Sequence, residues 1–431
     1  MRRTNTNNDA RRQPEQLNES KRGTPDFQLL VLTLLLVGFG LVMVFSSSSS
    51  IAVINSDFNN DSMYFVKRQL LFAIGGVIAM FITMNIPFQR YKKLFVPVFI
   101  VVIIILLLMP FIGSLRNGSR SWLILGPISI QPTEFAKITI ILYLAALITK
   151  KGERFRDLRT GYIPVTLIVG FVAGLIMLQP DFGSCLILVA TSGLIIFTGG
   201  ANLKHIMASL LLLAIGAGIV LGAKALIDGL HSSGAADSIT SGYKAGRFQA
   251  FIDPFKDPKG YGWNLLQSLT AIGHGGMTGT GFGQSIQKLH YLPNPYNDFI
   301  FSVIGEEFGF IGTLLFLIVY VYFIWRGLLV SLRCQDTFGT LVGVGIMGLI
   351  AIQAFVNIGG VTRTIPITGV TLPFISYGGS SLLVMMASMG IVLSISRSSV
   401  IIQKREVTKS VVIREDELNG RRQRYGRYET R

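Results

Sequence analysis

The feature that most restricts the fold of this chain is a succession of apolar segments, each roughly 18 to 25 residues long. An α-helix rises about 1.5 Å per residue, so each segment is long enough to cross about 30 Å of hydrocarbon. Only 14% of the 431 residues are charged, whereas a soluble protein carries about a quarter. The sequence therefore predicts an all-α polytopic membrane protein.

Ten of these segments are expected to cross the membrane, which places both termini on the same side. The first runs from Phe27 to about Phe45 and is too long for the apolar region of a signal peptide, so it is expected to remain as a span. The serines that follow it, Ser46–Ser50, are interpreted as a polar exit from the bilayer. The predicted spans are residues 27–45, 69–86, 95–113, 132–149, 163–179, 184–200, 206–226, 299–325, 338–358 and 381–396.

Lysine and arginine concentrate in both tails and in alternate short connections such as Gln89–Lys93 and Lys150–Arg159. Positive residues are retained on the cytoplasmic side of a membrane, so both termini are predicted to be cytoplasmic. The same placement accounts for the net charge of +16 without any nucleic-acid partner. The predicted organisation is a disordered cytoplasmic tail (1–26), a ten-span domain (27–396) with a large extracellular loop between spans seven and eight (227–298), and a basic cytoplasmic tail (397–431).

Three segments on the predicted outer face are more than simple connections. Ser114–Gln131 is polar, and Ile227–Asn297 is about 70 residues long, well beyond the usual length of a connection. The glycine series Gly276–Ser285 within it lacks the lysine of a phosphate-binding loop and is interpreted as a series of turns. Gly359–Ser380 is moderately apolar but contains two prolines, and non-helical backbone at membrane depth must lie against protein or water. We therefore expect Gly359–Ser380 to be a re-entrant segment.

Charged residues inside spans are rare because each is costly to insert, so they are expected to pair or to face a cavity. Glu134 and Lys137 are three residues apart and lie on one helical face. They form either a self-compensating ion pair or, together with Arg120, the lining of a polar groove. Glu306 and Glu307 are expected to pair with buried polar groups rather than to react.

Asp298 stands where the long outer loop meets the eighth span, after the proline-containing stretch YLPNPYN. A carboxylate at this position can cap the helix and interact favourably with its dipole. It can equally serve as a general base, because burial would raise its pKa and a neighbouring cation would lower it. The residues themselves leave both interpretations open.

Basic residues are more numerous on the predicted outer face than topology alone favours. They would suit an anionic ligand such as a lipid-linked pyrophosphate, although a solvated loop with its own counter-ions, Asp253 and Asp257, explains them as well. These residues are Arg120, Lys244, Arg247, Lys256, Lys259 and Lys288.

Taken together, the polar stretches resemble the SEDS family (shape, elongation, division and sporulation) of membrane glycosyltransferases, and most closely its FtsW and SpoVE branch rather than RodA. With the ten-span pattern the resemblance covers about residues 27–396. The stretches are NGSRSWLILGPISIQPTEFAK (117–137), LQPDFG (178–183), FIDPFKDPKGYGWNLLQSLTAIGHGG (251–276), GFGQSIQKLHYLPNPYNDFIFSVIGEEFG (281–309) and NIGGVTRTIPITGVTLPFISYGGSSL (357–382).

The resemblance implies polymerisation of lipid II into glycan strands at the outer face of the bacterial cytoplasmic membrane, together with a class B penicillin-binding protein transpeptidase, during division or sporulation. It implies that Asp298 is the general base of an inverting transfer. No cofactor is certain; a divalent cation, magnesium or manganese, is left open. Residues implied to line the substrate cavity are Arg120, Gln131, Glu134, Lys137 and Lys288, and Arg247 of the basic outer-face set is predicted to bind substrate with them.

The chain departs from the family pattern at a few positions. Asn294 and Tyr296 replace a glutamate and a histidine that the family usually carries, and Arg363 and Thr364 interrupt a stretch that is usually small and apolar. Two other functions remain open from the sequence, a lipid II flippase and a non-catalytic scaffold for the transpeptidase.

Overall fold

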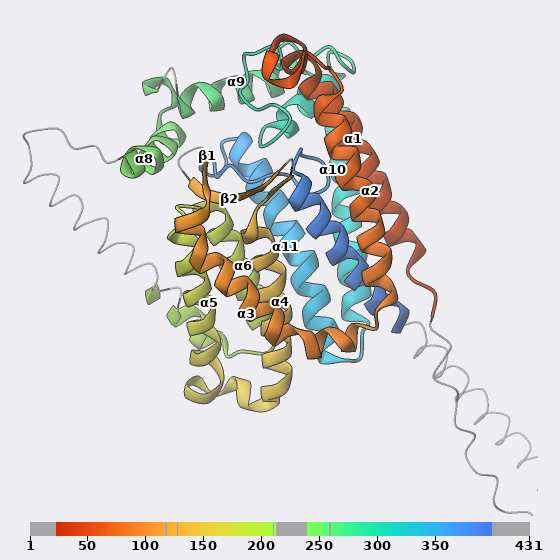
Figure 1. Cartoon of the computed structure of the whole chain (residues 1–431), viewed down its shortest axis with the longest axis vertical. Helices are drawn as coiled ribbons and strands as arrows, with labels where there is room; N and C mark the ends of the chain where they lie inside the picture. Colours follow the sequence, from red (N-terminus) through yellow and green to blue (C-terminus); the bar gives the residue numbers. More distant parts are fainter. Residues whose placement is uncertain are drawn as a thin grey trace, which may run out of the picture.

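A computed structural model shows a bundle of long, closely packed helices with shorter elements across one end (Figure 1). Eight helices in the described part of the chain are long and apolar enough to cross a membrane. The residues that the structure describes are 23–116, 119–126, 128–209, 211–212, 239–257 and 260–398.

The bundle helices confirm the all-α polytopic prediction, although their bounds differ from the predicted spans. The helix α6 is a shorter apolar helix at the place of a further predicted span, and the predicted span 206–226 lies largely outside the described residues. The helices are α1 (Phe27–Ile54), α2 (Tyr64–Asn85), α3 (Phe88–Ile112), α4 (Pro132–Lys151), α5 (Ile163–Met177), α6 (Phe182–Thr198), α10 (Ile300–Leu332), α11 (Thr337–Val361) and a last helix, Gly379–Ser398.

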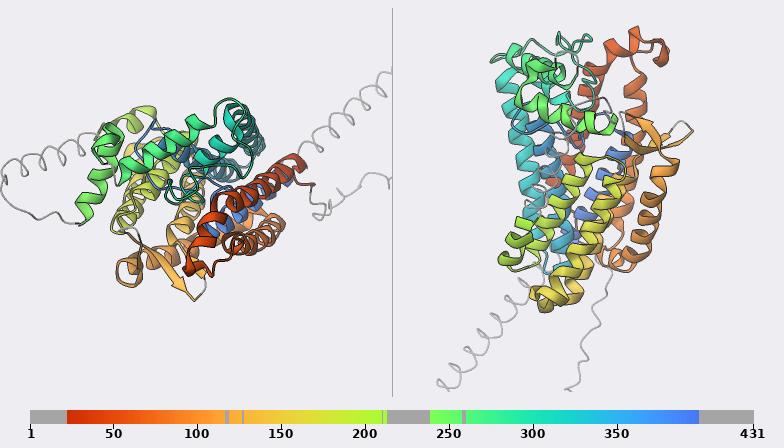
Figure 2. Two further views of the ribbon diagram at one scale, coloured as in Figure 1. Left: turned by 90° about the horizontal axis from the view of Figure 1, so that it is seen from above. Right: turned by 90° about the vertical axis from the view of Figure 1, so that its left-hand side faces the viewer.

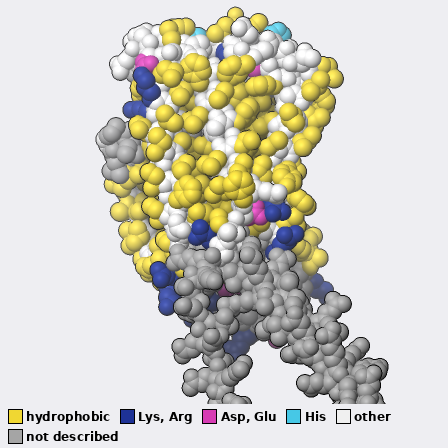
Figure 3. Space-filling model, turned by 90° about the vertical axis from the view of Figure 1, so that its right-hand side faces the viewer, with side chains coloured by type: hydrophobic (Ala, Val, Ile, Leu, Met, Phe, Trp, Pro, Cys, Tyr) yellow, Lys and Arg dark blue, Asp and Glu magenta, His cyan; other side chains and the backbone are white. Residues whose placement is uncertain are grey.

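The first and last helices meet at one end of the bundle. The backbone N–H of Asp26 donates to Ser396 Oγ at 3.0 Å, and the Asp26 carboxylate pairs with Arg326 of α10 at 2.6 Å. We call this the terminal end, and we call the opposite end the loop end (Figures 1 and 2). Hydrophobic side chains cover the flank between the two ends (Figure 3), as expected of a surface that faces lipid tails.

The serine run was wrongly interpreted as an exit from the bilayer. The helix α1 continues through it to Ile54, and the side chains of Ser46, Ser47 and Ser48 are buried. Ser47 and Ser48 donate to carbonyls one turn back in their own helix, at 2.7 and 2.6 Å. Hydroxyls satisfied in this way are tolerated inside a packed helix.

The loop end carries a small sheet and two helices that lie across the bundle (Figures 1 and 2). The antiparallel sheet was not anticipated; it forms between α3 and α4, in strand order β1–β2–β3. The helices α8 and α9 belong to the long loop, which is ordered over these residues. The elements are β1 (Ser114–Arg116), β2 (Ser119–Leu125), β3 (Ile128–Ile130), α8 (Ile239–Ile252), the short 3-10 turn Pro254–Lys256, and α9 (Tyr261–His274).

Residues 362–378 form the predicted re-entrant segment. Their backbone is largely non-helical and runs between the helices, so that the Phe374 carbonyl packs directly on Gly40, near the middle of α1. Tyr320, deep in α10, donates its hydroxyl to the Pro373 carbonyl at 3.3 Å. The side chain of Ile375 is fully buried. Protein therefore surrounds this irregular backbone, which is the condition under which such backbone is stable at membrane depth.

The helix α10 is interrupted at Gly309, whose φ of 64° and ψ of −168° are not helical. The loop that follows α9 hydrogen-bonds into the interruption. The N–H groups of Phe310 and Ile311 donate to the carbonyls of Gly276 and Met277, at 2.8 and 3.1 Å. The first turns of α10 are thus held to the glycine-rich loop, and this loop leads to Asp298.

Candidate active site

Asp298 does not cap the helix that follows it. The helix α10 begins at Ile300 with Phe299 as its N-cap, and there is no side-chain hydrogen bond at this cap. Instead, Asn357 of α11 holds the backbone of Asp298: its Nδ2 donates to the carbonyls of Asp298 and Val370, at 2.7 Å each. One buried amide thereby joins the end of the long loop to the re-entrant segment and leaves the Asp298 carboxylate available for another role.

Asp298 lines a cavity of about 10 Å³, bordered by α11 and by residues 367–370 of the re-entrant segment. Such a cavity has room for about one water molecule. Burial raises the pKa of Asp298 above its usual value, because the charged form loses water, and the nearby Arg247 guanidinium opposes the increase. A carboxyl group exchanges protons efficiently near neutral pH when its pKa is raised in this way. The environment of Asp298 therefore favours a role as general base.

Arg247 lies on α8 and reaches the same place from the opposite side. Its Nη1 donates to the Thr368 carbonyl at 2.6 Å, and its guanidinium lies 5.1 Å from the centre of the Tyr261 ring. The adjacent Gly369 has a φ of 75°, and a Cβ there would stand 3.0 Å from Arg247 Nη2. Arg247 is the predicted substrate-binding residue that the structure brings to Asp298.

Glu134 and Lys137 form a buried ion pair, with Lys137 Nζ 2.9 Å from Glu134 Oε1. Lys137 also donates to Gln353 Oε1 at 3.1 Å, and Gln353 Nε2 donates to the Thr371 carbonyl at 3.1 Å. A polar chain therefore runs from α4 through α11 to the re-entrant segment. The two charges are satisfied inside the protein, and they support the segment that closes the cavity beside Asp298.

The amides Gln353 and Asn357 are functional candidates that sequence reasoning missed. They lie four residues apart on one face of an otherwise apolar helix, and both donate to carbonyls of the re-entrant segment. Their spacing and polarity were the available signal. An amide in such a helix requires partners, because an unpaired polar group is costly away from water.

Gln131 and Arg120 have other neighbours. Gln131 immediately precedes α4, and its Nε2 donates to Asp181 Oδ2 at 3.2 Å; the Asp181 carboxylate caps α6 through the N–H of Ser184. Arg120 is exposed on β2, and its Nη1 donates to the Pro110 carbonyl of α3 at 3.0 Å. These contacts join helix ends at the loop end, and neither residue has a hydrogen bond to Asp298.

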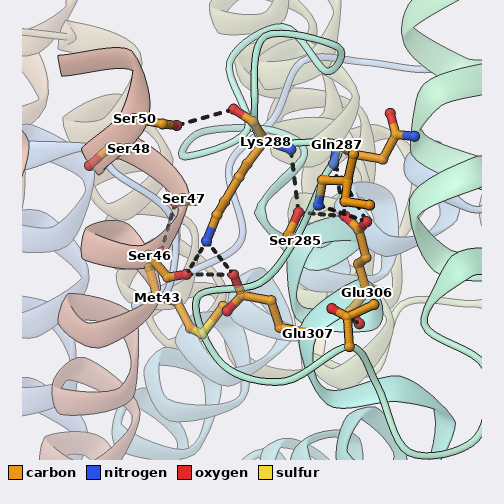
Figure 4. A network of polar contacts seen from close by, with 12 residues as sticks. Met43, Ser46, Ser47, Ser48, Ser50, Ser285, Gln287, Lys288, Glu306 and Glu307 are labelled. Carbon is orange, nitrogen blue, oxygen red and sulfur yellow. Dashed lines mark hydrogen bonds and ion pairs between the residues drawn. The ribbon is translucent and has the colours of Figure 1, made fainter. Parts of the chain in front are cut away.

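Lys288 lies in a buried network between α1 and α10 (Figure 4). Its Nζ is 2.7 Å from Glu307 Oε1 and 3.0 Å from Ser46 Oγ, and the Ser46 hydroxyl donates to the same Glu307 oxygen at 2.5 Å. Lys288 and Ser46 also line a mostly apolar groove of about 490 Å³ between α1 and the loop. The charge of Lys288 is compensated by a carboxylate, so the lysine joins the loop to two helices.

Glu306 joins the same loop to α10. Its fully buried carboxylate accepts hydrogen bonds from the Ser285 hydroxyl and from the N–H of Ile286 at 3.0 Å, and it contacts His274 Nδ1 at 2.9 Å (Figure 4). This confirms the expectation that Glu306 and Glu307 pair with buried polar groups. Neither carboxylate has a hydrogen bond to Asp298.

Two of the unusual residues have structural explanations. Asn294 has a φ of 50° and an exposed side chain; asparagine tolerates this left-handed conformation better than glutamate does. The Tyr296 ring packs on Phe65 with centroids 4.3 Å apart, and burial raises the pKa of Tyr296 to about 12. The turn before Asp298 is thus held by backbone preference and aromatic packing.

The described residues do not build a dedicated metal site, since they include no cluster of three or more His, Cys, Asp or Glu side chains. Asp298 has an arginine beside it rather than a second carboxylate. All-protein sites for hard divalent cations use several oxygen ligands, commonly carboxylates.

The fold and site define a multi-pass helical membrane protein with a carboxylate held between a re-entrant segment and a long loop. The chain belongs to the family of cell cycle proteins that comprises FtsW, RodA and SpoVE, whose model matches residues 27–401. It is 42% identical to stage V sporulation protein E of Bacillus subtilis (strain 168), over 88% of this chain and 99% of that protein. It is 39% identical to a probable peptidoglycan glycosyltransferase FtsW of Trichlorobacter lovleyi, over 86% and 93% of the two chains.

Solved structures agree with this membership. One, described as the structural coordination of polymerization and crosslinking by a peptidoglycan synthase complex, matches with a TM-score of 0.70 at 27% identity, over 87% of this chain and 98% of that one. The rod shape determining protein RodA of Thermus thermophilus matches with a TM-score of 0.61 at 26% identity, over 86% and 97%.

Proposed function

We propose that this protein is a peptidoglycan glycosyltransferase that polymerises lipid II at the extracytoplasmic face of the bacterial cytoplasmic membrane, with Asp298 as its general base. The observation that carries the proposal is the placement of Asp298. Its carboxylate does not cap α10, and its pKa is raised by burial. Its backbone is held by Asn357, and the Arg247 guanidinium lies nearby. Relatives named as peptidoglycan glycosyltransferases support the reaction class.

In this reaction the Asp298 carboxylate accepts the proton of the 4-hydroxyl group on the acceptor sugar. The hydroxyl oxygen attacks the anomeric carbon of the donor sugar, and the bond from that carbon to the pyrophosphate oxygen breaks with inversion. Undecaprenyl pyrophosphate leaves with the bonding electrons, and protonated Asp298 then returns its proton to solvent. The raised pKa makes Asp298 a stronger base than an exposed carboxylate.

The cavity at Asp298 is far too small for a disaccharide, so substrate binding at this residue requires the site to widen. The re-entrant segment lines the cavity, and α8 contacts this segment through the hydrogen bond from Arg247 to Thr368. A second pair of contacts joins them, because the Arg363 guanidinium donates to the carbonyls of Phe251 and Ile252, at 3.1 and 2.9 Å. We propose that α8 moves away from the re-entrant segment when substrate binds.

The decisive experiment compares purified wild-type protein with Asp298→Asn and Asp61→Asn in vesicles containing lipid II. Asp298→Asn retains side-chain volume and the backbone contact to Asn357, and the matched control is Asp61, which pairs with Lys67 near the start of α2. Glycan strands should form with wild-type protein and Asp61→Asn and should be absent with Asp298→Asn. Undiminished polymer from Asp298→Asn would refute the assignment.

The buried polar chain from Glu134 to the re-entrant segment favours one alternative, a lipid II flippase, because polar groups inside a bundle can mark a transport path. A flippase needs no base. Translocation of lipid II in liposomes that is lost in Lys137→Met but retained in Asp298→Asn, without glycan formation, would establish that alternative.

We also propose a class B penicillin-binding protein transpeptidase as partner, and a role in division or sporulation. The similarity to a structure described as a peptidoglycan synthase complex and to stage V sporulation protein E supports these proposals. Co-purification from membranes, with and without Asp298→Asn, tests the partner separately from catalysis. A scaffold would retain the partner and complement a deletion strain even as Asp298→Asn.

A further inference from the structure

An exposed apolar stripe runs along α8 and into the turn that follows it. Phe248, Ile252 and Phe255 are 58%, 62% and 75% exposed. Phe248 and Ile252 are four residues apart and lie on one face of α8, and Phe255 follows in the short turn after the extended residue Asp253. The opposite side faces the protein, since Ala250 is buried and Arg247 donates to the re-entrant segment. Three large apolar side chains on one surface indicate an interaction site rather than an ordinary solvated helix.

The contacts of Arg247 define the level of this stripe relative to the bundle. Arg247 donates to the Thr368 carbonyl, and Thr368 packs on Gly183 in the first turn of α6, where a Cβ would stand 3.0 Å from that same carbonyl. The helix α8 is therefore one arginine side chain away from the loop end of a bundle helix. It lies across the long axis of the molecule (Figure 2).

The surface next to the stripe is one that faces lipid. The helix α8 lies beyond the loop end of α5 (Figures 1 and 2). The outward side chains Leu167, Phe171 and Leu178, on α5 and just after it, are 67%, 54% and 64% exposed. In a membrane-spanning helix such side chains contact lipid tails. The stripe on α8 therefore lies near the level at which this apolar surface of the bundle ends.

We propose that α8 is an interfacial helix, which lies in the phospholipid leaflet at the loop end and inserts Phe248, Ile252 and Phe255 among the lipid chains. Helices that bind bilayer surfaces lie parallel to the membrane. Their apolar side chains face the acyl chains, and their cationic side chains lie among the headgroups. Lys256, whose side chain is 67% exposed, lies beside the stripe and pairs at its surface with Asp253 at 3.5 Å. Anionic headgroups attract such residues.

This assignment gives the membrane a direct contact with the site, because α8 carries Arg247 on its other side. A leaflet that holds the stripe restrains how far Arg247 can move from Asp298 and Thr368. The inference rests on exposure and contacts, so it holds whether or not Asp298 transfers glycosyl groups.

Site-directed spin labelling of the full chain tests the proposal. In a background with Cys185→Ser and Cys334→Ser, a nitroxide is attached at position 248, 252 or 255, or at the control positions 249 and 256, which are exposed but lie off the stripe. The protein is reconstituted in vesicles of phosphatidylcholine and phosphatidylglycerol. Collision with oxygen, which concentrates in lipid, is then compared with collision with a water-soluble nickel chelate.

The oxygen-to-nickel ratio should be severalfold higher at 248, 252 and 255 than at 249 and 256. Equal ratios at all five positions would overturn the proposal. If the stripe loses nickel accessibility only when a partner protein is added, its ligand is that partner and not the leaflet. If it loses accessibility only as protein concentration rises, its ligand is a second copy of the chain.

A second measurement covers the case in which the cysteine-free chain does not fold. Phe248→Trp and Gln249→Trp are made in the natural background, and phosphatidylcholine with brominated chains replaces the ordinary lipid. The added fluorescence should be quenched for Phe248→Trp and not for Gln249→Trp. Equal quenching of the two variants would reject the inserted stripe.

Discussion

Asn357 Nδ2 lies 2.7 Å from the backbone carbonyl of Asp298 and donates a hydrogen bond to it. The same nitrogen donates to Val370 at 2.7 Å. This side chain is 3% exposed, so water cannot replace its two hydrogen bonds. The position of the proposed base therefore depends on a single amide from another helix.

Asn357→Leu is expected to reduce polymerisation by roughly a hundredfold per folded molecule, since a displacement of about 1 Å at a reacting group can have an effect of that size. The variant should also lose about 1–3 kcal/mol of stability, because buried carbonyls lose their donor. The assay is glycan formation from lipid II, normalised to folded protein by gel filtration. Asn85→Leu, at the exposed end of α2, is the control and should retain activity. Full activity of Asn357→Leu would show that Asp298 is held by other contacts.

Burial raises the pKa of Asp298 and Arg247 lowers it, so the enzyme's activity is predicted to depend on pH. The carboxylate is the base, so activity should fall as the pH drops through its raised pKa. Arg247→Gln removes the charge that lowers this pKa, and the acidic limb of kcat/KM should therefore move to higher pH. Arg333→Gln, on the exposed connection after α10, should leave the limb in place. A shift of the limb to lower pH in Arg247→Gln would contradict the assigned electrostatics.

The buried pair of Glu134 and Lys137 predicts non-additive effects on stability. Lys137→Met leaves a buried carboxylate without its partner, which should lower the free energy of unfolding by about 3–5 kcal/mol. The double variant Glu134→Gln, Lys137→Met should be less damaged than the sum of the single changes. Thermal unfolding in detergent measures all three proteins. Additive losses would mean that the two residues do not act as a pair.

Gly309 should not tolerate a side chain. Its φ of 64° disfavours other residues, and a Cβ there would overlap the Gly279 backbone nitrogen. Gly309→Ala is expected to lower the unfolding temperature and to increase proteolysis of the loop 275–298. The control is Gly170→Ala in α5, where a Cβ would meet nothing within 4 Å. Since alanine favours a helix by about 1 kcal/mol over glycine, this control should be neutral or stabilising. Similar behaviour of both variants would show that the interruption of α10 is not needed.

Much of the architecture could be predicted because hydrocarbon imposes a strong constraint on a sequence. The lengths of the apolar segments were enough to locate most of the bundle helices. The prolines and glycines after Gly359 indicated a re-entrant segment. The serines after Phe45 misled the prediction, because hydroxyls that bond within their own helix resemble a polar exit in sequence. The sheet between α3 and α4 was missed because two of its three strands have only three residues each.

The candidate site was only partly predictable. Asp298 and Arg247 were both named from the sequence, but their proximity depends on how α8 folds back over the re-entrant segment. Lys288, by contrast, had the charge expected of an anion-binding residue. Its pairing with Glu307, 19 residues further along the chain, could not be predicted from the sequence separation. Charge is visible in a sequence, whereas the partner that neutralises it is a tertiary property.

The sequence by itself determined a membrane bundle, a long loop that ends in a carboxylate, and a set of buried charges, since each follows from the local chemistry of consecutive residues. Only the tertiary structure decided that Asp298 does not cap its helix, that Asn357 holds its backbone, and that Arg247 binds the part of the re-entrant segment that lines the cavity beside it. These relations join residues 59 and 121 positions apart. Packing of helices distant in the chain creates them, and no local pattern records that packing.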